Sequence, residues 1–302
     1  MTLPPYLKKG ANIGITCPAG YMPLANAQTC ITTLQSWGYN VIVGNTLGSH
    51  SKNYFSGSDA ERCEELQFML NDPNIDAILC ARGGYGVGRI IDALDFTKFI
   101  QHPKWIIGFS DITVLHSHIT KTLKVATLHA PMAAAFNNGQ YKNEYILSLK
   151  KALVGAKANY TSKPYTLNNI GTATAKLVGG NLSLLANMVG SVSDIKTKNK
   201  LLFLEDIGEQ LYSTDRMLRQ LQRAGKFKNL AGLILGGFTD TKDTERPFGK
   251  KIEAIIKDVI GDVTYPVCYR FPISHGKYNY AVKCGGTYTL TVTNTITRLK
   301  EN

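Results

Sequence analysis

The first half of the chain alternates between short apolar runs and stretches with a helical period, and this alternation constrains the fold more than any other feature. Apolar runs typical of strands lie at 12–17, 41–43, 75–81, 105–109 and 125–129, and helical patterns lie near 24–37, 58–70, 88–94 and 144–153. A strand, a helix and a strand within about 30 residues make a βαβ unit, whose strands are parallel and whose crossover is right-handed. The sequence therefore predicts an α/β protein that begins with a parallel sheet.

In the second half, the order and spacing of the expected strands and helices differ from those of the first half, which suggests a second domain. Residues 157–169 are rich in Thr, Ser, Asn and Lys, as linkers often are. Beyond them we expect strands at 201–206, 233–237 and 287–293, the last of edge type, and helices near 182–189, 213–225 and 254–260. The 302 residues suffice for two domains. We predict a first domain over 1–156, a linker over 157–172 and a second domain over 173–302.

The composition is that of an ordinary globular protein. No apolar run approaches the ~20 residues of a membrane helix, and the N-terminus does not resemble a signal peptide, so we expect a cytoplasmic protein without membrane contact. Six cysteines are scattered without a CxxC pair, which favours reduced structural thiols and no metal site. The net charge of +12 comes from dispersed lysines, which fits an acidic small substrate, or simply solubility, better than nucleic acid.

The apolar run that begins at Trp105 stops at Gly108-Phe109-Ser110-Asp111-Ile112 and turns at once into a helical pattern. Two interpretations compete for Ser110. It is the N-cap of the next helix, a common role for serine, or the nucleophile of a strand–turn–helix elbow. The elbow is usually Gly-x-Ser-x-Gly, and here Ile112 stands at the place of the second glycine.

A glycine-rich loop, Arg82-Gly83-Gly84-Tyr85-Gly86, follows the preceding strand. Its glycines serve a tight turn or let backbone N–H groups approach a ligand. Parallel neighbours end at the same rim of a sheet, so this loop and Ser110 should share the rim where open α/β sheets bind ligands. The loop lacks both common nucleotide-binding glycine patterns, which argues against a nucleotide cofactor.

A serine nucleophile needs a base, and the base is best held by a carboxylate. Among the histidines we expect packing or surface roles for His116 and His118 and solvated positions for His50 and His102, which leaves His129 and the loop residue His275 as candidates. The apolar strand at 201–206 ends in two carboxylates. Spacing alone does not choose between Glu205, Asp206 and Glu209.

Six short motifs in order along nearly the whole chain resemble the LD-carboxypeptidase family of serine peptidases, which also holds the microcin C immunity-type peptidases. They are Pro18-Ala19-Gly20, the 82–86 loop, the 108–113 elbow, Gly179-Gly180-Asn181-Leu182-Ser183, Leu204-Glu205-Asp206-Ile207-Gly208-Glu209 and Ser274-His275-Gly276. The resemblance implies an N-terminal Rossmann-like domain with a parallel sheet and a smaller C-terminal α/β domain. It also implies a homodimer that needs no metal or other cofactor.

Matched motif by motif, the resemblance implies a triad of Ser110 as nucleophile, His275 as base and Glu205 as its partner. The N–H groups of Gly84 and Asp111 would form the oxyanion hole. The family commonly has glycine before the histidine, where this chain has Ser274. The stretch 281–286 also lacks the Leu-Pro-x-Gly motif that is expected there from the family.

Arg82, with Gly83 and Tyr85 beside it, is expected to bind the substrate, Arg82 taking its terminal carboxylate. The implied reaction releases a C-terminal D-alanine from murein tetrapeptides during peptidoglycan recycling. Two alternatives remain: cleavage of a peptide–nucleotide or another acyl conjugate, and a non-catalytic muropeptide-binding protein. A small peptide or muropeptide is the expected partner in the main interpretation.

Overall fold

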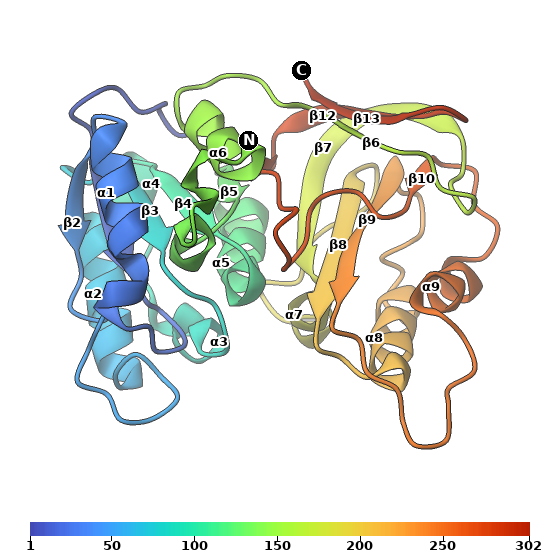
Figure 1. The fold of residues 1–302 in the computed structure, drawn as a ribbon, viewed down its shortest axis with the longest axis horizontal. Helices are drawn as coiled ribbons and strands as arrows, with labels where there is room; N and C mark the ends of the chain where they lie inside the picture. Colours follow the sequence, from blue (N-terminus) through green and yellow to red (C-terminus); the bar gives the residue numbers. More distant parts are fainter. The chain divides into compact units, whose positions relative to one another are not determined.

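The chain forms two compact units in a computed structural model that describes residues 1–302 (Figure 1). The first unit comprises Met1–Ala156 with Tyr280–Lys283, and the second comprises Lys157–Asn279 with Cys284–Asn302. None of the helices combines the length and the apolar character that a membrane crossing requires.

The first unit is built on a six-stranded sheet in the order β11-β5-β4-β3-β1-β2. Its strands are β1 Asn12–Thr16, β2 Asn40–Val43, β3 Ala77–Cys80, β4 Trp105–Gly108, β5 Thr127–His129 and β11 Val282–Cys284. The five strands from β1 to β5 pair in parallel, which confirms the predicted parallel sheet. β3 and β4 are buried along their whole length, as expected of a parallel sheet covered on both faces.

The helices of the first unit are α1 Gln28–Ser36, α2 Asp59–Asn71, α3 Val87–Ile90, α4 Thr97–Gln101, α5 Thr113–His118 and α6 Glu144–Leu153. A 3₁₀ turn, Leu24–Ala27, precedes α1, and another, Ile91–Ala93, follows α3. The helices expected at 24–37 and 88–94 are therefore each partly 3₁₀. α2 begins with a capping box between Ser58 and Glu61, as the sequence predicts.

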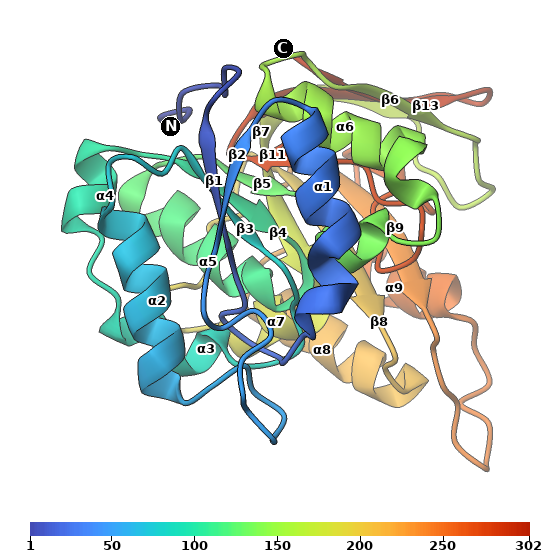
Figure 2. The same cartoon turned by 60° about the vertical axis from the view of Figure 1, so that its left-hand side comes forward.

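Helices cover both faces of the first sheet. α1 and α6 share one apolar core with the strand residues Ile13 and Ile15 of β1 and Trp105 of β4. On the opposite face α2 comes so close that a Cβ on Gly14 would lie 2.9 Å from the sulfur of Met69. Figure 2 shows α1 and α2 on opposite sides of the strands.

The strand order reverses between β1 and β3, because the chain adds β2 on one side of β1 and β3 on the other. Such a switch point opens a crevice at the carboxyl ends of the two strands. The loops that follow β1 and β3 meet there, where the Gly20 N–H donates to the Gly83 carbonyl at 3.0 Å.

The edge strand β11 comes from far along the chain. Just before it, the Ala281 N–H donates to the Ser148 hydroxyl at 2.9 Å and Tyr280 bonds to Glu144, both on α6. Within it, Lys283 is buried with its amine 4.8 Å from the ring centroid of Tyr6. The first unit is therefore completed by residues that follow most of the second unit in sequence.

The second unit contains a mixed seven-stranded sheet in the order β10-β9-β8-β7-β12-β13-β6. The strands are β6 Asn159–Ser162, β7 Gly171–Asn181, β8 Leu201–Ile207, β9 Gly232–Thr239, β10 Val267–Cys268, β12 Thr287–Val292 and β13 Thr297–Glu301. β7 to β10 are parallel, whereas β7, β12, β13 and β6 pair antiparallel.

Two sequence expectations differ from this sheet. The stretch 157–172, expected as a linker, includes β6, which pairs with β13 through polar, half-exposed residues that give no apolar strand signal. β12, expected at an edge, lies between β7 and β13. Its alternating pattern reflects one buried and one exposed face, which an interior antiparallel strand also shows.

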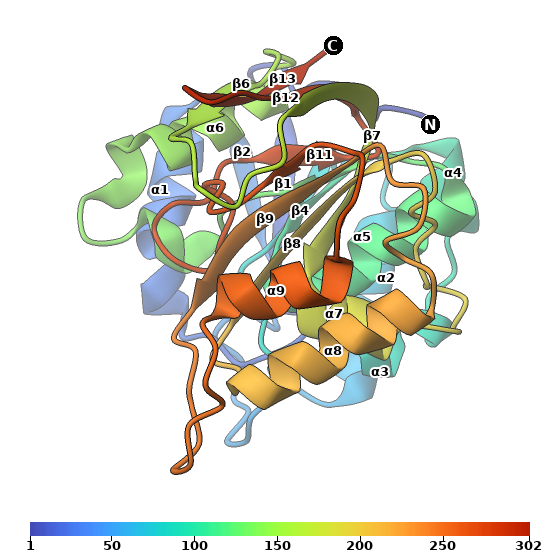
Figure 3. The same ribbon diagram turned by 90° about the vertical axis from the view of Figure 1, so that its right-hand side faces the viewer.

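The helices of the second unit are α7 Leu182–Asn187, α8 Leu211–Arg223 and α9 Ile252–Ile260. α8 packs against both α7 and α9. Figure 3 shows α8 and α9 on one side of β8 and β9.

Candidate active site

Ser110 stands directly beyond β4 with its backbone in the left-handed region, at φ +63°. This conformation costs an L-residue about 1–2 kcal/mol and is the sharp turn expected of a nucleophile elbow. The N-cap of the helical turn that follows is Phe109, and no side-chain bond caps that turn. The structure thus contradicts the N-cap interpretation of Ser110.

Gly108 explains why this elbow accommodates isoleucine at its second glycine position. Its φ is +157°, and a Cβ there would lie 2.8 Å from Cγ1 of Ile112. Since glycine has no Cβ, the Ile112 side chain fits against the backbone before Ser110. The turn is closed by an apolar contact rather than by a second glycine.

The glycine-rich loop lies against Ser110, as the shared rim predicts. A Cβ on Gly83 would lie 2.9 Å from Ser110 Oγ and 3.3 Å from the Asp111 nitrogen. A Cβ on Gly84, at φ +97°, would lie 2.9 Å from the Tyr54 hydroxyl. Gly83, rather than Gly84, therefore makes the closest approach to the serine.

Gly86 completes the loop at φ +155°, where a Cβ would lie 2.6 Å from Nη1 of Arg62 and 2.9 Å from Cα of Ala19. Gly83 and Gly86 thus each have a neighbour within the first unit that leaves little room for a side chain, whereas at Gly84 only the end of the exposed Tyr54 side chain comes close. Close packing at Gly83 and Gly86 and a positive φ at Gly84 and Gly86 therefore both favour glycine in this loop.

Two other loop residues are exposed. Arg82 donates from Nη1 to the Tyr21 carbonyl at 2.5 Å. The Tyr85 side chain is 52% exposed, and its ring lies 6.0 Å from that of Phe55. Both are accessible to a ligand at the rim of the first sheet.

The side chain of Asp111 points away from solvent and ties the elbow to the glycine-rich loop. It is fully buried, and its Oδ2 accepts a hydrogen bond from the Val87 N–H at 2.8 Å. Burial raises the pKa of Asp111 to about 6, although the Val87 N–H and Arg62 oppose the shift. The family resemblance implies a role only for the backbone N–H of this residue, so its buried carboxylate is an additional feature of the site.

Three histidines pack within the first unit. Buried His116 bonds through Nε2 to the Gly108 carbonyl at 2.9 Å, and burial lowers its pKa to about 4. The ring of His118 stacks on Phe96, with the centroids 5.2 Å apart. His129 is buried with its ring centroid 5.9 Å from Phe109. The packing roles predicted for His116 and His118 are confirmed.

In the second unit, His275 pairs with Glu205. Glu205 lies near the end of β8 and is fully buried, and its Oε2 is 2.5 Å from Nδ1 of His275. A buried carboxylate is costly unless it is paired, and this contact supplies the pairing.

The neighbouring carboxylates have other partners. Asp206 accepts from Asn181 Nδ2 at 2.8 Å and from the Ser183 N–H at 3.1 Å, and burial raises its pKa to about 7. Glu209 accepts from the Ser213 hydroxyl at 2.8 Å. The structure therefore separates three carboxylates that spacing alone leaves equivalent.

Sequence reasoning missed Arg62 on α2, which is fully buried. It contacts the loops after β1 and β3 through the carbonyls of Pro18 and Gly86. One signal was available, since Arg62 lies four residues before Leu66 and eight before Leu70, on the apolar stripe of the helix.

Comparisons with known proteins cover both units. A family model described as the LD-carboxypeptidase N-terminal domain matches residues 13–130, and one described as the LD-carboxypeptidase C-terminal domain matches residues 174–290. The chain is 34% identical over 285 residues to a probable murein peptide carboxypeptidase of Bacillus subtilis, covering 93% of this chain and 89% of the relative. It is 27% identical to the murein tetrapeptide carboxypeptidase of Pseudomonas aeruginosa, covering 92% of each chain.

A solved structure supports the same assignment. The crystal structure of muramoyltetrapeptide carboxypeptidase from Oxalobacter formigenes superposes with a TM-score of 0.87 at 26% identity. The match covers 97% of this chain and 99% of that one. The predicted two-domain α/β fold is therefore confirmed.

We expect Gly108→Ala to destabilise the first unit by about 3 kcal/mol, because it adds left-handed strain and a clash with Ile112. Urea unfolding followed by tryptophan fluorescence measures this, since both tryptophans, Trp37 and Trp105, lie in the first unit. Gly88→Ala is the matched control. Gly88 lies in α3 with open space at its Cβ position, so alanine there should be neutral or stabilising by up to about 1 kcal/mol. Equal effects of the two substitutions would contradict this account of Gly108.

His116 should make the first unit sensitive to acid. The unfolded chain takes up a proton near pH 6.5, whereas folded His116 stays neutral down to about pH 4. The unfolded state binds more protons between these values, so the free energy of unfolding falls as pH falls through this window, by up to about 3 kcal/mol.

The measurement is the stability difference between the wild type and His116→Gln, by urea unfolding from pH 7 to pH 4. Asp111 and the other carboxyl groups titrate in both proteins and largely cancel in the difference. The wild type should lose its advantage as pH falls. A difference that does not change with pH would show that burial of His116 does not drive the titration.

Proposed function

The chain belongs to the LD-carboxypeptidase family, and from this premise we propose that it is a serine carboxypeptidase that releases a C-terminal D-alanine from murein tetrapeptides. The observation that carries the proposal is the strained Ser110 packed against Gly83 in one unit, together with the Glu205–His275 pair in the other. The names of the relatives from Bacillus subtilis and Pseudomonas aeruginosa support the substrate class.

In the proposed reaction, Ser110 Oγ attacks the carbonyl carbon of the bond between an L-configured centre and the terminal D-alanine. His275 takes the serine proton and later gives it to the leaving amine, while Glu205 orients the imidazole through Nδ1. Release of D-alanine leaves an acyl-enzyme on Ser110, which water hydrolyses with His275 again acting as base.

Backbone N–H groups would hold the oxyanion that forms on the substrate. We propose those of Asp111 and Gly84, which flank the point where Gly83 meets Ser110. Losing one such donor typically lowers the rate by about 10²–10³-fold. In this proposal the Asp111 N–H would bind the oxyanion, while its carboxylate accepts a hydrogen bond from the Val87 N–H.

We extend the proposal to the protein's setting, on the strength of the family resemblance. The protein would act in the cytoplasm during peptidoglycan recycling and form a homodimer, which sedimentation of the purified protein tests.

Ser110→Ala should abolish release of D-alanine, with a loss of about 10⁴-fold or more, because the nucleophile is gone. Mass spectrometry of a murein tetrapeptide incubated with each protein detects the loss of one alanine. Ser117→Ala is the matched control. Ser117 is buried in α5 and its hydroxyl has no hydrogen-bond partner, so the change should leave activity intact.

Three outcomes separate the interpretations. Release by the wild type and Ser117→Ala but not by Ser110→Ala supports the proposal. Release by all three proteins would show that Ser110 is not the nucleophile. No release by folded wild type would exclude this substrate and lead to peptide–nucleotide substrates, and then to a binding role.

Arg82→Ala should raise KM for the tetrapeptide by about 10-fold or more, because we propose that its guanidinium binds the terminal carboxylate. Steady-state kinetics should show a smaller change in kcat than in KM. Lys98→Ala removes an exposed cation of the same unit, on the helix α4 that precedes β4, and it should leave KM unchanged. Unchanged KM and kcat in Arg82→Ala would remove Arg82 from the substrate site.

A further inference from the structure

Arg62 is a fully buried guanidinium at the point where the loops of the first unit converge. Burying this group is costly unless its N–H groups are bonded. Nη1 donates to the Pro18 carbonyl at 2.6 Å and to the Gly86 carbonyl at 3.2 Å, and Nη2 pairs with Asp59. Nε is buried without a hydrogen-bond partner, so the cost is only partly offset.

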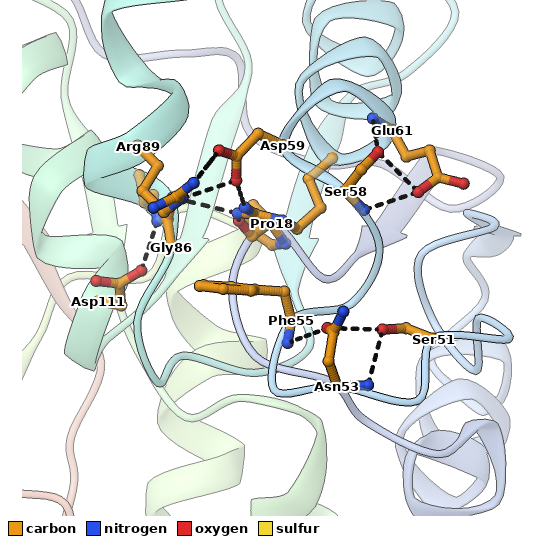
Figure 4. A network of polar contacts seen from close by, with 12 residues as sticks. Pro18, Ser51, Asn53, Phe55, Ser58, Asp59, Glu61, Gly86, Arg89 and Asp111 are labelled. Atoms are coloured by element: carbon orange, nitrogen blue, oxygen red, sulfur yellow. Dashed lines mark hydrogen bonds and ion pairs between the residues drawn. The ribbon is translucent and has the colours of Figure 1, made fainter.

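The Arg62 guanidinium also packs closely against Phe55 and Gly86. The guanidinium carbon lies 4.8 Å from the ring centroid of Phe55, a cation–π distance. Gly86 leaves room for Nη1, which would be 2.6 Å from a Cβ at that position. In Figure 4, Pro18, Gly86, Asp59 and Arg89 gather above the ring of Phe55.

The two ends of the glycine-rich loop are held by different groups. At its start, Gly83 lies against Ser110 and accepts from the Gly20 N–H. At its end, Gly86 accepts from Arg62, and the next N–H, of Val87, donates to Asp111. The direction of the N–H groups between these points depends on both anchors, because a peptide plane turns as one unit.

We propose that Arg62 is a positioning residue that fixes the glycine-rich loop against Ser110 and so sets the N–H group that the loop offers to the oxyanion. The assignment rests on the proposed function, since it concerns the same reaction. Arg62 touches no reacting atom and acts through Gly86 and Pro18. A planar guanidinium suits the task because it reaches two carbonyls and a carboxylate at once, which a lysine amine on a flexible stem does not do.

The chain offers a matched control in Arg89. It pairs with the same Asp59, at 2.6–2.9 Å, and its guanidinium carbon lies 5.4 Å from the same Phe55 ring. It is 45% exposed, and its side chain bonds neither loop carbonyl. Arg89 also interacts with the exposed side chain of Tyr85. The comparison of the two arginines therefore separates the bonds to the backbone carbonyls of Pro18 and Gly86 from contacts with side chains alone.

The test compares Arg62→Met, Arg62→Lys and Arg89→Met by tetrapeptide kinetics and by amide hydrogen exchange. Arg62→Met should lower kcat by about 10²-fold, the usual penalty for misplaced catalytic groups, with KM changed less than about 3-fold. Amides of residues 82–87 should exchange faster while those of β4 stay protected. Arg62→Lys should be intermediate in both readouts, and Arg89→Met should match the wild type.

Either of two results would overturn the proposal. One is a folded Arg62→Met or Arg62→Lys protein with wild-type kcat and wild-type exchange at 82–87. The other is an equal loss in Arg89→Met. If Arg62→Met does not fold, Arg62→Lys, which keeps the charge, decides alone. The exchange measurement needs no substrate, so it tests positioning even if the wild type releases no D-alanine and the proposed function fails.

Discussion

The left-handed backbone at Ser110 is the constraint around which the first unit is arranged. A strained residue persists only where its surroundings over-determine it, and here they do so from several sides. β4 is buried before the turn, His116 bonds the Gly108 carbonyl, and Ile112 fills the space that Gly108 leaves. Gly83 then lies directly on the serine. The strain and the loop contact are therefore two results of the same packing.

In the second unit, two buried carboxylates are adjacent in β8 and have different partners. Glu205 and Asp206 are adjacent in β8, so their side chains point to opposite faces. One bonds His275, and the other bonds Asn181 and the start of α7. Each carboxylate has its own partners, and burial raises the pKa of Asp206, which has no cation among its hydrogen-bond partners. The end of this strand thus holds two acids in different electrostatic settings.

The sequence predicts most of what local pattern and parallel topology determine. The capping box at Ser58, the helix Glu144–Leu153 and the meeting of the glycine-rich loop with Ser110 all follow from spacing. The elements missed are those whose signals are not apolar. β6 is a polar strand that pairs with β13, and its sequence has the polar composition of a linker.

The site was less accessible to sequence reasoning because its contacts join distant residues. The family resemblance selected Glu205 over Asp206, whereas the structure distinguishes them by their partners, His275 for Glu205 and Asn181 for Asp206. Arg62 bonds a carbonyl 44 positions away, and no local pattern encodes that contact. The triad and oxyanion assignments remain predictions, of which Ser110→Ala tests the nucleophile.

The return of the chain to the first sheet as β11 has a consequence for biosynthesis. A polypeptide ending at Ala156 has the five parallel strands but lacks the edge strand beside β5 and the Lys283–Tyr6 contact. During translation the first sheet therefore keeps an open edge until nearly the whole second unit has left the ribosome. Unpaired edges are where chains associate wrongly, so the nascent protein passes through a vulnerable stage that ends only when β11 has been synthesised and pairs with β5.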